Sequence, residues 1–395
     1  PLVINAQWET QSPIPTRLQV VGIASPTAQH TIIATDDNPY DNYGAMFEST
    51  DGGITWTPRD IPETHTDGFN GMFFIDNQYG WAYGDSSYYT TNGGIDWLPL
   101  SIQETIFFLE FYTVDFGVMM GWSGWNVSLD GGHTWNPSPF DMRSFDFIDS
   151  QTGLGKSDST IYHTNDGGLS FNQVYTGGNI GDISFLSPTV AIAIEDSSFI
   201  RSNDGGLTWN TISSAEGRSQ LLKVTSNVAL AWGRSGSYPD YDDRIFRTAD
   251  AGLTWTDIGE VMDPGSNAAD FSFAVPDAQT IVGHDGAGNM YHSNDAGVNW
   301  SQVFETRGGV YPSFIAKPIP CFADALNGYF AIGNGFVIKT TDGGASWTQI
   351  SSGSSQKING IDRFDNGDLI AVGDDGTLLK NSGGNSNWIA HTEFS

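Results

Sequence analysis

The 395-residue sequence has little cysteine, few basic residues and no long apolar run, and each shortage excludes a class of protein. Cys321 is the only cysteine, so the chain can form neither an internal disulfide nor a cysteine-rich metal site. Lys and Arg number 16 against 46 Asp and Glu, which gives a formal net charge of −30. A chain this acidic repels phosphate backbones and anionic lipids, so nucleic acid and membrane surfaces are poor partners.

Two features of the chain bear on where it works. No apolar run approaches the roughly 20 residues that span a bilayer, so membrane insertion is not expected. The first residues lack the basic-then-apolar pattern of a leader, and Pro1 stands where an initiator Met would be. We therefore expect a processed form of a secreted bacterial protein, located extracellularly or at the cell surface.

Glycine and aromatic residues, by contrast, are abundant. The 48 glycines far exceed the usual share of about 7%, which indicates many tight turns. An apolar content of 38%, including 13% aromatic residues, is ample for a packed core and excludes disorder.

One octapeptide, for example STDGGITW ending at Trp56, recurs along the chain. Eight clear copies end on an aromatic residue, and a degenerate ninth, NSGGNSNW, ends at Trp388. These aromatic residues are 36 to 47 positions apart, the length of one four-stranded propeller blade. The third residue of each clear copy is Asp or Asn: Asp51, Asn92, Asp130, Asp166, Asp204, Asp250, Asp295 and Asp342.

The composition of the octapeptide predicts a structural role. Its Asp can accept hydrogen bonds from backbone N–H groups of its own turn. Its glycines, such as Gly94 and Gly132, permit the positive φ that a tight hairpin requires. The final aromatic residue can bury about 150–250 Å² between neighbouring blades.

Each repeat also contains four short strand signals. In the second repeat they lie at 68–76, 79–84, 87–91 and 95–100, and no stretch shows helical periodicity. We predict an all-β fold: a single β-propeller domain over residues 1–395 with nine four-stranded antiparallel blades, eight or ten blades being the alternatives. The segment 3–10, built around Trp8, is predicted to be the strand that closes the ring.

The octapeptide resembles the Asp-box of BNR repeats in sialidases, sortilin-type receptors and xyloglucan-active hydrolases. The longer unit, FFIDNQYGWAYG followed by TTNGGIDW, looks most like photosystem II assembly-factor (Ycf48-like) repeats, which are widespread in secreted bacterial proteins without a photosynthetic role. The resemblance is specific for the fold and weakly informative about function. Photosystem assembly depends on a basic patch in that family, and a net charge of −30 argues against such a patch here.

Loop length varies on only one face of the predicted propeller. The octapeptide turns (c–d) and the a–b turns are uniformly short. Long b–c loops occur at 36–44, 121–125 and 233–243, and long d–a loops occur at 62–68, 259–270 and 305–314. Because long loops in compact domains are usually functional or mobile, we predict a binding site on the b–c/d–a face.

Two groups of residues on this face are candidate ligands. The first consists of aromatic residues that could stack on a sugar or anchor a protein: Trp122, Trp125, Trp232, Tyr238 and Tyr241. Blade packing and loop anchoring are the alternative role for them. The second is a set of carboxylates in two acidic loops: Asp36, Asp37, Asp41, Asp240, Asp242 and Asp243. These suggest calcium, although neither loop has EF-hand spacing and solvated acidic surface is the alternative. No other cofactor is expected.

A catalytic role is less favoured, and no catalytic residue is assigned. A sialidase-like site needs an arginine cluster, whereas Arg201 and Arg247 are expected on blade surfaces beside octapeptides. Carboxylates recur at the a–b turns, where turn capping is the simpler role: Asp76, Asp115, Asp149 and Asp277. We expect an extracellular binding or scaffold propeller that engages a protein or a glycan, the alternative being a glycoside hydrolase or polysaccharide lyase.

Overall fold

The computed structural model is all-β and contains no helix in the part of the chain that it describes. Nine four-stranded antiparallel sheets are present there, so the predicted β-propeller of nine four-stranded blades is confirmed. The structure describes residues 20–24, 26–27, 29–35, 46–51, 55–59, 68–102, 104–137, 144–214, 220–233, 235–237, 240–242, 244–260, 272–284, 289–304, 321–322, 324–331, 336–351, 356–363, 369–373, 377–381 and 389–390. The predicted closing strand at 3–10 and the ninth-repeat Trp388 lie outside these ranges.

The chain divides into two compact units. The first comprises Pro1–Phe107, Ala331–Val337 and Gln349–Ser395, and the second comprises Phe108–Phe330 and Ile338–Thr348. Whether the whole chain behaves as a single domain therefore stays a prediction. The first unit contains three sheets: β1–β4 (Val20–Ala24, Thr31–Thr35, Met46–Ser49, Thr57–Arg59), β5–β8 (Phe69–Phe74, Gly80–Gly84, Tyr88–Thr90, Leu98–Pro99) and β35–β38 (Ile358–Arg363, Leu369–Gly373, Leu378–Asn381, Ile389–Ala390).

The second unit contains most of the remaining strands, and the boundary between the units falls within β9 and within the sheet β31–β34. Its sheets are β9–β12 (Ile106–Phe111, Gly117–Gly121, Gly124–Ser128, Asn136–Pro137), β13–β16 (Ser144–Phe147, Gly153–Lys156, Thr160–Thr164, Asn172–Thr176), β17–β20 (Ile180–Ser187, Val190–Glu195, Ser198–Ser202, Asn210–Ser214), β21, β22, β25 and β26 (Gln220–Lys223, Ala229–Trp232, Arg244–Thr248, Thr256–Glu260), β27–β30 (Ser272–Ala274, Ile281–His284, Met290–Ser293, Ser301–Phe304) and β31–β34 (Cys321–Phe322, Gly328–Ala331, Phe336–Thr340, Thr348–Ser351).

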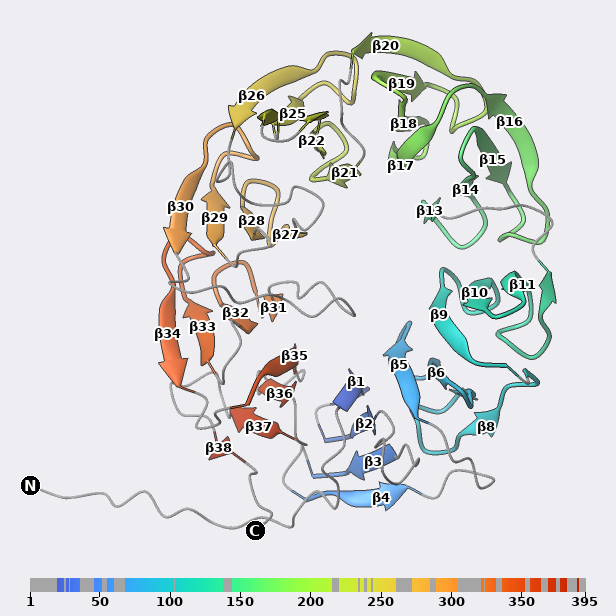
Figure 1. The fold of residues 1–395 in the computed structure, drawn as a ribbon, viewed down its shortest axis with the longest axis vertical. Helices are drawn as coiled ribbons and strands as arrows, with labels where there is room; N and C mark the ends of the chain where they lie inside the picture. Colours follow the sequence, from blue (N-terminus) through green and yellow to red (C-terminus); the bar gives the residue numbers. More distant parts are fainter. Residues whose placement is uncertain are drawn as a thin grey trace, which may run out of the picture. The chain divides into compact units, whose positions relative to one another are not determined.

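Burial within each blade follows the strand order. Second strands such as β2 (TIIAT) and β18 (VAIAIE) are almost entirely buried and read as continuous apolar runs, as expected of strands covered on both faces. Fourth strands such as β16 and β20 are largely exposed. In the second unit the first strands β13, β17 and β21 contact one another in succession, whereas β16, β20 and β26 lie at the far edge of each sheet (Figure 1). The core therefore lies between blades, around their first three strands.

Two predicted b–c loops have more order than the sequence suggested. Residues 121–125 do not form a long loop: Gly121 pairs with Gly124, and Trp122 and Ser123 make a two-residue hairpin turn between β10 and β11. Gly124 adopts φ +96°, which permits this tight connection. In the 233–243 segment, β23 (Ser235–Ser237) and β24 (Asp240–Asp242) pair as a separate two-stranded sheet inserted between β22 and β25.

The second repeat has its four strands at the predicted places, each shorter than predicted and the fourth most of all. The fourth strand is only Leu98–Pro99, because residues 95–97 belong to the octapeptide turn. No helix in the described ranges is long and apolar enough to pass through a bilayer.

Candidate functional site

The clearest exposed candidate on the predicted b–c/d–a side is Trp122. It lies at the tip of the β10–β11 hairpin, and 77% of its surface is exposed. Trp125 follows on β11 and is half-buried, with its ring edge-on to Phe108 of β9 at 5.8 Å between centroids. The hairpin therefore presents one indole to solvent, while a second indole packs against a ring of β9, two strands away in the same sheet.

The structure places Trp232 differently from Trp122. Trp232 ends β22 and is only 6% exposed, with its ring edge-on to Phe273 of the next blade at 4.8 Å. It belongs to a core cluster with Leu230 and Ile281, which is the packing role weighed against ligand binding in the sequence. Of the other predicted aromatic residues, Tyr238 lies outside the described residues and only the backbone of Tyr241 is described, in β24.

Carboxylates on this side of the second unit hold a loop in place. The Glu195 carboxylate, at the β18–β19 turn, accepts hydrogen bonds from the Tyr175 hydroxyl at 2.9 Å and from the Gly178 N–H at 2.7 Å. Asp196, with φ +47°, accepts a hydrogen bond from the Asn179 N–H at 2.9 Å. Burial, together with the hydrogen bond from Tyr175 to Glu195 and the negative charge there, raises the pKa of Tyr175 to about 12. The d–a connection at 176–179 is thus fixed by the b–c turn of the next blade.

The acidic loops proposed for calcium fall mostly outside what the structure describes. Asp36, Asp37, Asp41 and Asp243 lie outside the described residues, and only the backbone of Asp240 and Asp242 is described. Among the side chains that are described, no three His, Cys, Asp or Glu residues gather as metal ligands. The calcium hypothesis stays a prediction.

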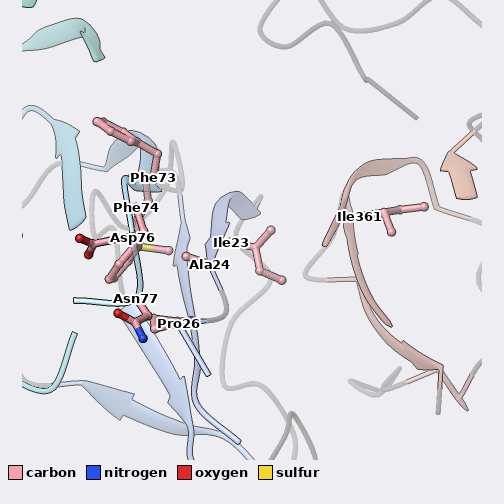
Figure 2. A pocket seen from close by; sticks show the side chains of 9 residues that line it. Ile23, Ala24, Pro26, Phe73, Phe74, Asp76, Asn77 and Ile361 are labelled. Atoms are coloured by element: carbon pink, nitrogen blue, oxygen red, sulfur yellow. The ribbon is translucent and has the colours of Figure 1, made fainter. Parts of the chain in front are cut away.

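A pocket of about 470 Å³ lies in the first unit, at the ends of first strands where the a–b turns begin. Figure 2 shows Asp76 and Asn77 at its β5 side and Ile361, from β35, at the opposite side, with Ile23 and Ala24 of β1 between them. The remaining lining residues are apolar: Pro26, Met72, Phe73 and Phe74. Sequence reasoning missed this pocket because its walls come from repeats far apart in the chain.

The octapeptide turn has a repeated geometry, which the Asp204 copy illustrates. Asp204 Oδ1 accepts hydrogen bonds from Ser202 Oγ at 2.7 Å and from the Thr208 N–H at 2.9 Å, and Oδ2 accepts from Thr208 Oγ1 at 2.7 Å. The Thr208 hydroxyl and the other donors hold the pKa of Asp204 at about 2. The same carboxylate pattern recurs at Asp51, Asp130, Asp166, Asp250, Asp295 and Asp342.

The rest of the octapeptide completes the turn. Ser202 Oγ accepts from the Gly206 N–H at 2.8 Å, and Trp209 Nε1 donates to the Gly206 carbonyl at 2.9 Å. The Gly205 N–H donates to the Thr189 carbonyl at 2.9 Å, which ties the c–d turn to the a–b turn of the same blade.

A family model for the BNR/Asp-box repeat matches residues 47–58, which contain the whole first octapeptide. The octapeptide is a BNR/Asp-box repeat. Its geometry recurs at the other copies, so the chain is an Asp-box propeller. None of the curated proteins matches the sequence.

Several solved structures resemble the Asp-box propeller in fold. The computationally designed Ika8 protein is 11% identical, with 95% of this chain and 99% of that chain covered and a TM-score of 0.52. BamB from Moraxella catarrhalis is 12% identical, with coverages of 95% and 98% and a TM-score of 0.50. A structure of YCF48 bound to D1 peptide is 17% identical, with coverages of 87% and 95% and a TM-score of 0.44. At these identities the likeness concerns the fold alone.

The second Asp-box glycine packs closely against the preceding blade. Gly206 has φ +93°, and a Cβ there would lie 2.6 Å from Leu154 Cδ2 of the preceding blade. A second-strand or nearby core side chain of the preceding blade stands against the same glycine in other Asp-boxes: Ile32 against Gly94, Phe116 against Gly168, Ile192 against Gly252, Leu230 against Gly297 and Val282 against Gly344. The Asp-boxes therefore set blade spacing as well as turn geometry.

The two arginines beside Asp-boxes are not blade-surface residues, contrary to expectation. Arg201 is only 5% exposed, and its Nε donates to the Ala251 carbonyl of the next blade's Asp-box at 2.6 Å. Arg247 Nε donates in the same way to the Ala296 carbonyl at 2.7 Å. Ala251 and Ala296 occupy the first glycine position with φ +56°, so each arginine meets an Asp-box where Ala replaces that glycine.

The a–b turn carboxylates cap their turns at three of the four predicted positions. The Asp76 carboxylate accepts hydrogen bonds from the backbone N–H groups of the second and third residues after it, at 2.8 and 2.7 Å, and Asp149 and Asp277 do the same. Asp115 does not cap its turn, because Thr113 Oγ1 accepts from the Asp115 and Phe116 N–H groups instead.

Two half-buried carboxylates were missed in the sequence. Asp146 Oδ2 on β13 accepts from the Phe185 N–H on β17 at 2.6 Å, and Asp182 Oδ2 on β17 accepts from the Leu221 N–H on β21 at 2.9 Å. Burial raises the pKa of both carboxyl groups, although these backbone donors act in the opposite direction. The available signal was an Asp inside an otherwise apolar first strand. Their geometry is that of clamps between successive first strands.

Proposed function

We propose that the chain is a binding module that holds a partner protein through its b–c/d–a side, with Trp122 as the central contact. The observation that carries the proposal is the 77% exposed indole on a two-residue turn. Tryptophan dominates the energetics of many protein interfaces, and a rigid tip loses little conformational freedom when it docks. The extracellular or cell-surface setting is part of the proposal and is supported by the resemblance of the repeats to those of secreted bacterial proteins.

The surroundings of Trp122 favour binding over chemistry. The hairpin is braced by Trp125 against Phe108, and a d–a connection two blades further along the same unit is fixed by Glu195. The Glu195 and Asp196 carboxylates accept backbone hydrogen bonds, so they act as loop anchors. A pre-organised surface of this kind suits recognition of a folded partner.

The test starts from the exposed indole. A photo-crosslinking aromatic residue at position 122 should capture a partner in cells of the source organism, whereas the same residue at position 207 should not. Leu207 is the matched control, because it is 50% exposed but lies on an Asp-box turn at the other end of its strands.

The purified partner then provides the quantitative test. Trp122→Ala should weaken its binding by about 30-fold or more, as expected for a hot-spot tryptophan, while Leu207→Ala leaves the Kd unchanged. Equal affinity of the wild-type chain and the Trp122→Ala variant would contradict the proposal. Glycan binding that depends on Trp122, or new reducing ends released from a polysaccharide, would instead support the carbohydrate alternatives.

A further inference from the structure

The 470 Å³ pocket of the first unit has an apolar body. Ile23 of β1 and Ile361 of β35 are half-buried, and so are Phe73 and Phe74 of β5. These side chains are not fully covered by the core, so an apolar group placed among them would be removed from water. The volume lies within the range of ligand pockets in proteins, about 300–1,000 Å³.

The walls of the pocket are held in place by close packing. Gly22 of β1 lies so close to β5 that a Cβ on it would meet Met72 at 2.7 Å. Phe73 stacks on Trp81 with 5.3 Å between centroids, and Phe74 stands edge-on to Trp97 at 5.9 Å. The pocket is therefore a preformed feature of the packed blades.

Two polar groups at the β5 side of the pocket have capacity for a ligand. Asp76 Oδ1 is used by the a–b turn, through the N–H groups of Gln78 and Tyr79. Within the described part of the chain, Asp76 Oδ2 and the Asn77 side-chain amide make no hydrogen bond, and both residues are exposed. A carboxylate oxygen accepts only, whereas an amide both donates and accepts.

We propose that this pocket binds a polypeptide segment in which an aliphatic or aromatic side chain stands next to a lysine or arginine. The apolar residue would fill the space among Ile23, Phe73 and Ile361, and the cation would pair with Asp76. The Asn77 amide, as donor and acceptor, matches the N–H and C=O of a peptide group. The net charge of −30 favours a basic segment over an acidic one. The proposal uses no residue of the Trp122 hairpin, so failure of either proposal leaves the other intact.

Two tetrapeptides test the proposal on the full chain. Acetyl-Gly-Phe-Lys-Gly-amide should bind with a Kd below about 1 mM in ligand-detected NMR, and the version with Glu in place of Lys should bind at least about fivefold more weakly. Equal binding of the two peptides, or no binding of the lysine peptide at about 5 mM, would overturn the proposal.

Matched variants locate the binding. Asp76→Asn removes the charge but keeps an oxygen that can cap the turn, as Asn92 does in its own turn. This variant should bind the lysine peptide at least about fivefold more weakly than the wild-type chain does. Asp149→Asn makes the same change in an equivalent a–b turn of another blade, with the same capping bonds, and should leave binding unchanged. An equal loss in both variants would contradict the assignment to this pocket.

The apolar half needs its own variant. Ile361→Ser should weaken the binding of both tetrapeptides, because it removes apolar surface without changing the charge at Asp76. A thermal melt of each variant checks that the fold is retained. Undiminished binding by a folded Ile361→Ser variant would show that the peptide lies elsewhere and would overturn the proposal.

Discussion

At the scale of single residues, Asp204 shows how one carboxylate organises a whole turn. It joins the hydroxyls of Ser202 and Thr208 and the Thr208 N–H around two oxygens. Hydrogen bonds to a charged acceptor stabilise more than neutral ones, although solvent at this exposed turn reduces their effect. These hydrogen bonds all lie within the turn itself, so they do not depend on a neighbouring blade.

Replacing this carboxylate should reveal its contribution. We expect Asp204→Ala to lower the free energy of unfolding by about 1.5 kcal/mol, because three donors lose their acceptor. Asp204→Asn should cost less, since Asn92 serves at the same position in the second repeat and its Oδ1 accepts the Asp96 N–H. Urea denaturation of both variants at neutral pH checks the order. An alanine variant as stable as the asparagine variant would contradict it.

The same residue should also show in the pH dependence of stability. The folded-state pKa of Asp204 is about 2, below the ordinary value of 3.8. A lowered pKa means that ionised Asp204 stabilises the fold above pH 3.8 and that this contribution is lost as pH falls through 2. The stability difference between the wild-type chain and Asp204→Asn should therefore be constant near neutral pH and shrink below about pH 4.

The sequence predicted local roles better than contacts between repeats. The hydrogen-bonding Asp and the positive-φ glycines follow from the chemistry of a single turn, so one octapeptide is enough to infer them. Arg201 was misplaced because its partner, the Ala251 carbonyl, lies 50 residues away in the next blade. Asp115 was misassigned because Thr113, two residues earlier, offers a competing cap.

At the scale of blades and turns, the two Asp-box glycines have different tasks. Gly205 adopts φ +75°, and a Cβ there would lie 3.1 Å from the Pro188 carbonyl oxygen. Alanine already occupies this first position in two other boxes, at Ala251 and Ala296. Gly206 instead lies against Leu154 of the neighbouring blade, where an added methyl group has no room.

This difference predicts an asymmetric pair of variants. Gly206→Ala should destabilise the chain by about 3 kcal/mol, because it adds backbone strain to a clash between blades. Gly205→Ala should lower the free energy of unfolding by only about 1 kcal/mol. Chemical denaturation of the two single variants gives the comparison directly. Similar losses would mean that the blade contact at Leu154 relaxes easily.

Elements were predictable where a repeat carries its own signals, and less so where blades meet. The strands of the second repeat follow from alternating apolar residues and glycine boundaries. Residues 121–125 were expected to form a long loop because the two tryptophans and two glycines lack a strand pattern, yet Gly121 and Gly124 pair directly. The pocket could not be predicted, because Ile23, Asp76 and Ile361 come from three repeats whose alignment in space is not written in any one of them.

At the scale of the whole molecule, the excess of negative charge should weaken the fold at low ionic strength. With 46 acidic and 16 basic side chains, the compact state carries considerable self-repulsion. Added salt screens these charges, so we expect the midpoint of thermal unfolding to rise by at least about 3 °C between about 10 mM and 500 mM NaCl. Calorimetry across a salt series measures this. A flat or falling midpoint would show that local ion pairs outweigh the repulsion.

The arginine contacts give a direction to each blade that carries one. Arg201 extends from one edge of its blade to a carbonyl on the following blade, and Arg247, 46 positions later, makes the same contact with Ala296. A module of this type therefore presents a cation at its leading edge and an acceptor at its trailing edge. A duplicate of the blade that carries both Arg247 and Ala251 would offer an acceptor to the arginine before it and a guanidinium to the Asp-box after it. Lengthening the array in this way is consequently a change that the chain could absorb without leaving a buried guanidinium unmatched.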